Sequence, residues 1–162
     1  MSICRFLRVF ALGTWVGAII FFVAGVAAVV FTVLGNRDDA GALVRVSLGR
    51  LHTLGLICAL VFVVASLAAG GPVGGSVSAL ARPAVLGVIL MAALTFTSQN
   101  VVMKRMRNLQ RQMGSVDATP ADNALRAEFD KLHNISVRLE GAVLLIGIAS
   151  IFLMVRGDLA GK

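Results

Sequence analysis

The feature that most restricts the fold of this chain is a run of 26 residues, 9–34, without a charged side chain. As an α-helix it would be about 39 Å long, which exceeds the ~30 Å hydrocarbon core of a bilayer. Three further apolar stretches follow, at 51–69, 83–103 and 135–155. A backbone in lipid must satisfy its own hydrogen bonds, and segments of this length do so as helices. We therefore predict an all-α integral membrane protein, a four-helix bundle that forms one domain over residues 1–162.

Composition supports a membrane protein and argues against a nucleic-acid-binding one. Hydrophobic residues make up 58% of the chain and charged residues only 14%, whereas a soluble domain has about 25% charged residues. The net charge of +7 would suggest nucleic acid in a soluble protein. Here the basic residues flank apolar segments, where they meet anionic lipid, and no aromatic side chains are interleaved with them. The expected partner is the lipid bilayer, with no nucleic acid.

The first apolar segment contains a GxxxG pair, Gly13 and Gly17. Small residues at this spacing let a second helix approach closely. We expect them to pack against another helix inside the bundle. The alternative is that they contact a second copy of the chain or another membrane subunit.

The connections between the predicted spans contain recognisable helix signals. The third helix is expected to continue beyond the membrane and to stop at Gly114. Thr119 and Pro120 are typical of an N-cap and a first helical position, so we expect the fourth helix to begin at Pro120. The segment 104–134 then forms a helical hairpin outside the membrane. Residues 40–50 mix basic and apolar side chains and could lie at the membrane surface before the second span.

The basic residues are distributed unequally between the two sides of the predicted bundle. The side with both termini and the 70–82 connection carries five Lys and Arg residues, and the side with the other two connections carries ten. We name the second one the basic side. The positive-inside rule places the basic side in the cytoplasm. The expected location is a bacterial inner (plasma) membrane with both termini outside the cytoplasm.

The uncharged part of the last apolar stretch is too short to cross a bilayer alone. Between Glu140 and Arg156 it has 15 residues, or about 22 Å of helix. The polar residues that precede it must therefore enter the membrane or lie at its edge. Arg138 and Glu140 are about 200° apart on a helix, so they do not pair. We expect Arg138 to extend to the lipid head groups and Glu140 to face the bundle interior.

Polar residues lie at the four helix ends on the basic side, where they can converge on one pocket. On the last helix, positions i, i+3 and i+7 share a face. The candidate ligand-binding residues are His52, Asn100, His133, Ser136 and Glu140.

Three interpretations of this predicted pocket remain open. It can be a polar network that locks helix packing, or a site for a small polar ligand, a cation or a proton. The third is a haem or metal site through His52 and His133, with Glu140 as a further ligand. That ligand set is thin, because the chain has no HxxxH or HExxH pair. The expected state has no cofactor.

The opening of the last helix resembles a known family. Phe129, Leu132, His133 and Ser136 form an F-x-x-L-H-x-x-S pattern that is similar to an uncharacterised bacterial four-span membrane family related to animal transmembrane protein 205. The resemblance extends to a Trp-Val-Gly sequence in the first span. It implies a four-helix membrane bundle and supplies no catalytic residues. The chain departs from the family pattern at Glu140, where the family carries Asn, and it lacks the family's aromatic, proline-containing entry to the second span.

No nucleophile, base and orienting group occur together in the sequence, so we predict no catalytic residues and no enzyme. The leading interpretation is a multi-pass inner-membrane protein whose basic-side pocket binds a small polar ligand, cation or proton. The alternative is an accessory or scaffold subunit of a larger membrane complex. A bis-histidine redox protein is the further alternative.

Overall fold

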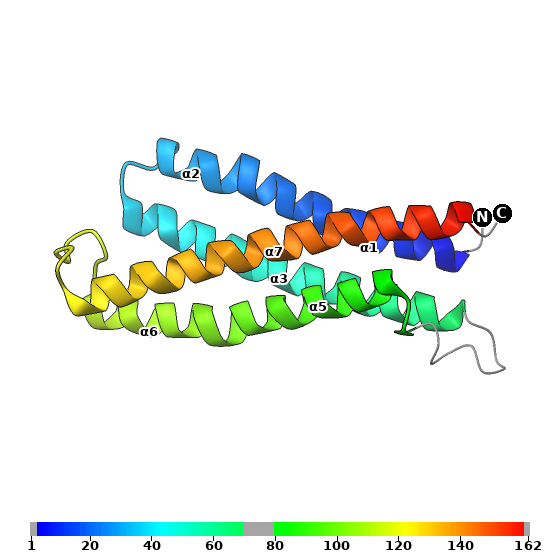
Figure 1. The fold of residues 1–162 in the computed structure, drawn as a ribbon. Helices are drawn as coiled ribbons and strands as arrows, with labels where there is room; N and C mark the ends of the chain where they lie inside the picture. The colour runs from blue at the N-terminus through cyan, green and yellow to red at the C-terminus, as the bar shows by residue number, and fades with distance from the viewer. Residues whose placement is uncertain (1–2, 70–79, 161–162) are drawn as a thin grey trace.

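The computed structural model describes residues 3–69 and 80–160. Within them the chain forms four long helices arranged as a bundle (Figure 1). Each is long and apolar enough to cross a membrane, which confirms the predicted all-α four-helix membrane bundle. The bounds of its segments are, in chain order, α1 Ile3–Phe21, η1 Phe22–Ala27, α2 Ala28–Val33, α3 Arg37–Ala68, α5 Pro83–Thr97, η2 Ser98–Val102, α6 Met103–Met113 and α7 Ala124–Ala160.

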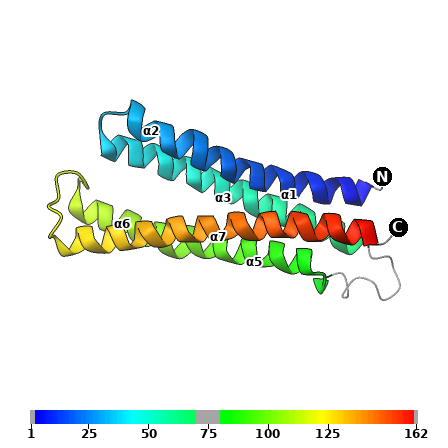
Figure 2. The same ribbon diagram turned by 45° about the horizontal axis from the view of Figure 1, so that its top comes forward.

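Two of the four helices contain a π-helical segment. The first helix runs through α1, η1 and α2, and the third through α5, η2 and α6. Consecutive helices are neighbours: α1 packs on α3, α3 on α5, α5 on α7, and α7 returns to α1. Therefore α3 and α7 lie diagonally across the bundle. The start of α1 and the end of α7 lie at one end, and the α6–α7 hairpin lies at the other, which we call the basic end (Figure 2).

Two glycines allow the helices to approach closely. A Cβ atom on Gly55 would lie 2.3 Å from Nε1 of Trp15, and one on Gly147 would lie 2.6 Å from Cγ2 of Val16. Trp15 is 1% exposed, so its indole fills the space that Gly55 leaves open between α1 and α3. A side chain therefore has no room at either position.

The expectation that Gly13 and Gly17 pack inside the bundle is wrong. Both are exposed, and a Cβ atom on either would meet no atom within 4 Å. The reason is the larger apolar face of the same helix, which occupies the core with positions i, i+3, i+4 and i+7 and turns the glycines outward. That face consists of Leu12, Trp15, Val16 and Ile19.

Two predicted boundaries are also corrected. The helix α3 runs without a break from Arg37, so residues 40–50 form its first turns and do not turn along the surface separately. The helix α7 begins at Ala124 and not at Pro120. Asn123 caps it, because its Oδ1 accepts a hydrogen bond from the Leu125 N–H at 2.9 Å. The predicted stop at Gly114 is confirmed, with a φ of 76°.

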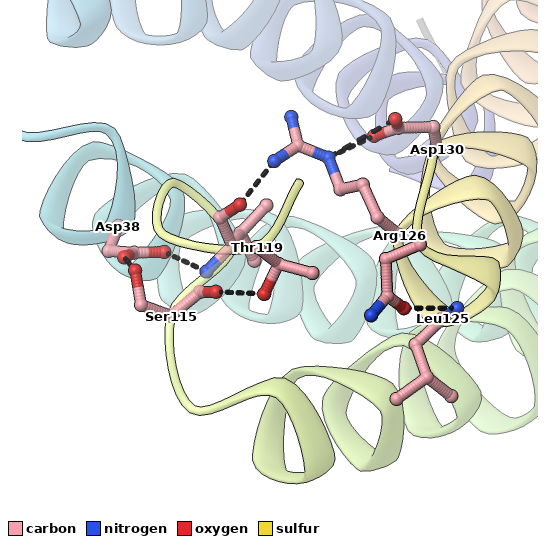
Figure 3. Close-up of polar contacts among 8 residues, drawn as sticks. Asp38, Ser115, Thr119, Leu125, Arg126 and Asp130 are labelled. Atoms are coloured by element: carbon pink, nitrogen blue, oxygen red, sulfur yellow. Dashed lines mark hydrogen bonds and ion pairs between the residues drawn. The ribbon is translucent and has the colours of Figure 1, made fainter. Parts of the chain in front are cut away.

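The connection between α6 and α7 is fastened to the start of α3 (Figure 3). The carboxylate of Asp38 accepts hydrogen bonds from the Ser115 hydroxyl and from the Val116 N–H, the latter at 3.0 Å. On the other side, Arg126 donates to the Val116 carbonyl and to the carboxylate of Asp130. These contacts hold the hairpin against the helix that carries His52.

The Trp15–Gly55 contact leads to a stability prediction. We expect Gly55→Ala to lower the free energy of unfolding by about 1–3 kcal/mol, because the rigid indole must move to admit the methyl group. Thermal unfolding in detergent measures the change. Gly49→Ala is the matched control on the same helix, since its Cβ would meet no atom within 4 Å. Equal unfolding temperatures for the two variants would contradict the packing described here.

Candidate functional site

A buried hydrogen bond between His52 and Glu140 is the central polar contact of the bundle. Nε2 of His52 bonds Oε1 of Glu140. His52 is 1% exposed and Glu140 is 8% exposed. Because His52 lies on α3 and Glu140 on α7, the bond crosses the diagonal of the bundle. It joins two helices that are not otherwise packed face to face.

The His52–Glu140 pair lies where the apolar stretches of both helices begin, since His52 is the second residue of 51–69 and Glu140 directly precedes the uncharged residues 141–155. His52 is 15 residues from Arg37, where α3 begins, and Glu140 is 16 residues from Ala124, where α7 begins. Each is therefore about 23 Å along its helix from the basic end. A lone ion buried between membrane-spanning helices is costly. The pair has no net charge as imidazolium and carboxylate, or as imidazole and carboxylic acid.

Four polar side-chain atoms are buried without a hydrogen-bond partner in the described residues, and two of them, Nδ1 of His52 and Oγ of Ser98, lie near the pair. Ser98 is 0% exposed and begins the π-helical segment η2, a kind of segment that is frequent at functional sites. Ser98 is 15 residues from Met113, where α6 ends at the basic end. His52 is also 15 residues from the basic end of its helix, so the two residues lie at about the same level of the bundle. Three other hydroxyls in the spans, those of Thr53, Ser66 and Thr97, bond a carbonyl one turn earlier, as Ser66 does to Phe62 O at 2.7 Å.

The structure brings together only part of the five-residue set that the sequence suggested. His52 and Glu140 are bonded, and Ser136 is buried one turn before Glu140. Asn100 is partly buried, and its Nδ2 donates to the Phe96 carbonyl of its own helix at 3.1 Å. His133 is exposed.

The sequence predicted that His133 lines the pocket inside the bundle, and the structure shows that it is exposed instead. His133 lies on the same face of α7 as Ser136 and Glu140, as expected, and two turns before Glu140. At that level the first helix packs against α3 through α2, whereas further along it covers α7 through α1. The first helix therefore covers this face of α7 at Glu140 and leaves it exposed at His133.

This arrangement does not support a shared haem or metal between the two histidines. Nε2 of His52 is engaged by Glu140, and His133 is exposed. Among the residues described, no three His, Cys, Asp or Glu side chains form a group that could hold a metal ion.

The separation of the two charges on the last helix is confirmed. Arg138 is exposed and Glu140 is buried. Of the polar residues that the sequence grouped with Glu140 in one pocket, the structure selects His52 as its hydrogen-bond partner. Ser98 was missed, because its burial depends on the packing of α5 and η2 against their neighbours. The only signal for it was the change from apolar to polar residues at 95–100.

Comparison with protein families identifies the chain. Residues 10–115 match the family described as "Domain of unknown function (DUF4149)". The chain belongs to this family. The match covers most of the first three helices and includes His52, while Glu140 lies beyond it. No curated protein and no solved structure matches the chain. The relation to transmembrane protein 205 stays a prediction.

The diagonal hydrogen bond predicts energetic coupling between α3 and α7. A double-mutant cycle of His52→Ala and Glu140→Ala should show a coupling energy of about 1 kcal/mol, a size typical of polar contacts within membrane bundles. Unfolding in detergent by a denaturing surfactant gives the four free energies. The matched control is the cycle of His133→Ala with Glu140→Ala, which should be additive within about 0.5 kcal/mol. Additivity in the first cycle would contradict the bond.

Proposed function

We propose that this chain is a non-enzymatic multi-pass membrane protein whose His52–Glu140 pair binds a proton inside the bundle. The observation that carries the proposal is the bond between Nε2 of His52 and Oε1 of Glu140, buried far from the helix ends. Ionisable side chains within membrane spans are expensive, and they commonly mark proton or ion pathways.

The chemistry of the pair favours a proton over a larger ligand. Glu140 is the one buried acidic residue among those described, whereas cations such as Ca²⁺ need six or more oxygen ligands. A small polar molecule needs a cavity, and a proton needs only a lone pair. Nδ1 of His52 supplies one when Nε2–H donates to Glu140, because a neutral imidazole has one donor and one acceptor nitrogen.

Proton binding at this pair changes its charge by one. In the unloaded state the neutral imidazole donates from Nε2 to the Glu140 carboxylate, and the pair has a charge of −1. A proton that adds to Nδ1 gives an imidazolium beside the carboxylate, and the net charge becomes zero. The low dielectric of the interior strengthens the attraction between the two ions. The protonated pair therefore places no net charge in its apolar surroundings.

The chain allows a direct test, because it has only two histidines. In a His133→Ala background, ¹⁵N-histidine NMR reports His52 alone, provided that no histidine tag remains. We expect reversible protonation at Nδ1 while Nε2 stays hydrogen-bonded. We expect Glu140→Gln to abolish that protonation, because an amide cannot balance an imidazolium. An unchanged titration in Glu140→Gln, or none in the parent protein, would overturn the proposal.

The orientation follows the charge distribution. We place the basic end in the cytoplasm of a bacterial cell and both chain termini outside it, because ten of the fifteen basic residues belong to the basic side as the sequence defines it.

An accessory subunit of a larger membrane complex is the second candidate, and the exposed glycines favour it. Gly13 and Gly17 leave a flat strip on α1 that a helix of another subunit or of a second copy can approach. We expect Gly17→Leu to leave the unfolding temperature unchanged and to dissociate a complex that is isolated in mild detergent. A parent chain that always migrates as a monomer would eliminate this candidate.

A further inference from the structure

We propose that the hollow between α6 and α7 binds the headgroup of an anionic phospholipid. This site is separate from the His52–Glu140 pair and does not depend on the proposed function. The hollow has a volume of about 590 Å³. Its lining combines two basic, one acidic and three apolar side chains, namely Arg105, Lys131, Glu128, Ala127, Leu132 and Ile135.

The position of the hollow matches the edge of the membrane. Ile135 begins the last apolar stretch of the chain, and Arg105 follows the end of the third apolar stretch by two residues. The apolar wall of Leu132 and Ile135 therefore continues toward the hydrocarbon, while the charged side chains lie nearer the hairpin. A molecule with an acyl chain and a charged head has the same order of apolar and polar parts.

The charges in the hollow favour an anion. The ammonium of Lys131 has no hydrogen-bond or ion-pair partner within 3–69 and 80–160. Arg105 bonds Glu128 through Nε at 2.7 Å and through its Nη2 group. A guanidinium has five N–H donors, so the contact with Glu128 orients Arg105 and leaves donors on its other edge. Two cations and one carboxylate give the lining a net charge of +1.

A phosphodiester fits these donors because Arg binds phosphate oxygens through paired N–H groups and Lys binds them as a point charge. Basic pockets between membrane helices on the cytoplasmic side are known to bind lipid head groups. The apolar wall favours a phospholipid over a free phosphate ion, because it gains contact with the acyl chain only when one is present.

Native mass spectrometry of the purified protein tests the site with two lipids, phosphatidylglycerol and phosphatidylcholine. Phosphatidylglycerol should be retained and phosphatidylcholine lost. Lys131→Gln should weaken phosphatidylglycerol binding about fivefold, as expected for one basic residue at a membrane surface. Lys104→Gln is the matched control: Lys104 is an exposed lysine at the same end that does not line the hollow. It should have no effect.

One uncharged change separates a built site from general attraction to the basic end, and one change of charge tests the role of Glu128. Ala127→Phe fills the hollow without altering charge and should also reduce phosphatidylglycerol binding. Glu128→Gln removes the competing carboxylate from Arg105 and should strengthen it. Equal losses in Lys131→Gln and Lys104→Gln, or full binding in Ala127→Phe, would overturn the proposal. Displacement of the lipid by an equal concentration of inorganic phosphate would also overturn it.

Discussion

The hydrocarbon core of a membrane offers no hydrogen-bond partners, and this constraint shapes the whole structure. Every backbone amide in the spans must bond within its own helix, so the long apolar stretches form helices. Side chains obey the same constraint. The hydroxyls of Thr53 and Thr97 donate hydrogen bonds to backbone carbonyls one turn earlier in their own helices. His52 and Glu140 have no such local solution and satisfy each other across the bundle.

That diagonal bond depends on how closely the helices can pack. Lipid chains are as apolar as leucine, so helices in a membrane associate through van der Waals contact and interhelical hydrogen bonds. Gly55 admits the indole of Trp15, and Gly147 lies against Val16 and Met91. These contacts bring α1 against both α3 and α7. The two helices that carry the ionisable pair are thereby held on either side of one apolar core.

The basic end follows different rules, because water and head groups are available there. The hairpin is fastened by exposed and half-buried polar contacts, such as Asp38 with Val116 and Arg126 with Asp130. The first helix diverges from α7 at this end and packs on α3 alone. One consequence is the exposure of His133. The hollow that we propose for a lipid head group lies nearer this end than the His52–Glu140 pair does, because its lining on α7 ends at Ile135, five residues before Glu140.

The sequence by itself determined the number of spans, the helical fold, the turn at Gly114 and the burial of Glu140. Each of these depends on length, on local backbone chemistry or on the cost of a short acidic side chain in lipid. Only the tertiary structure decided the rest. It selected His52 and not His133 as the partner of Glu140, turned Gly13 and Gly17 outward, and buried Ser98. The physical reason is that helical periodicity states which residues share a face, whereas the crossing of the helices decides which stretch of that face is covered.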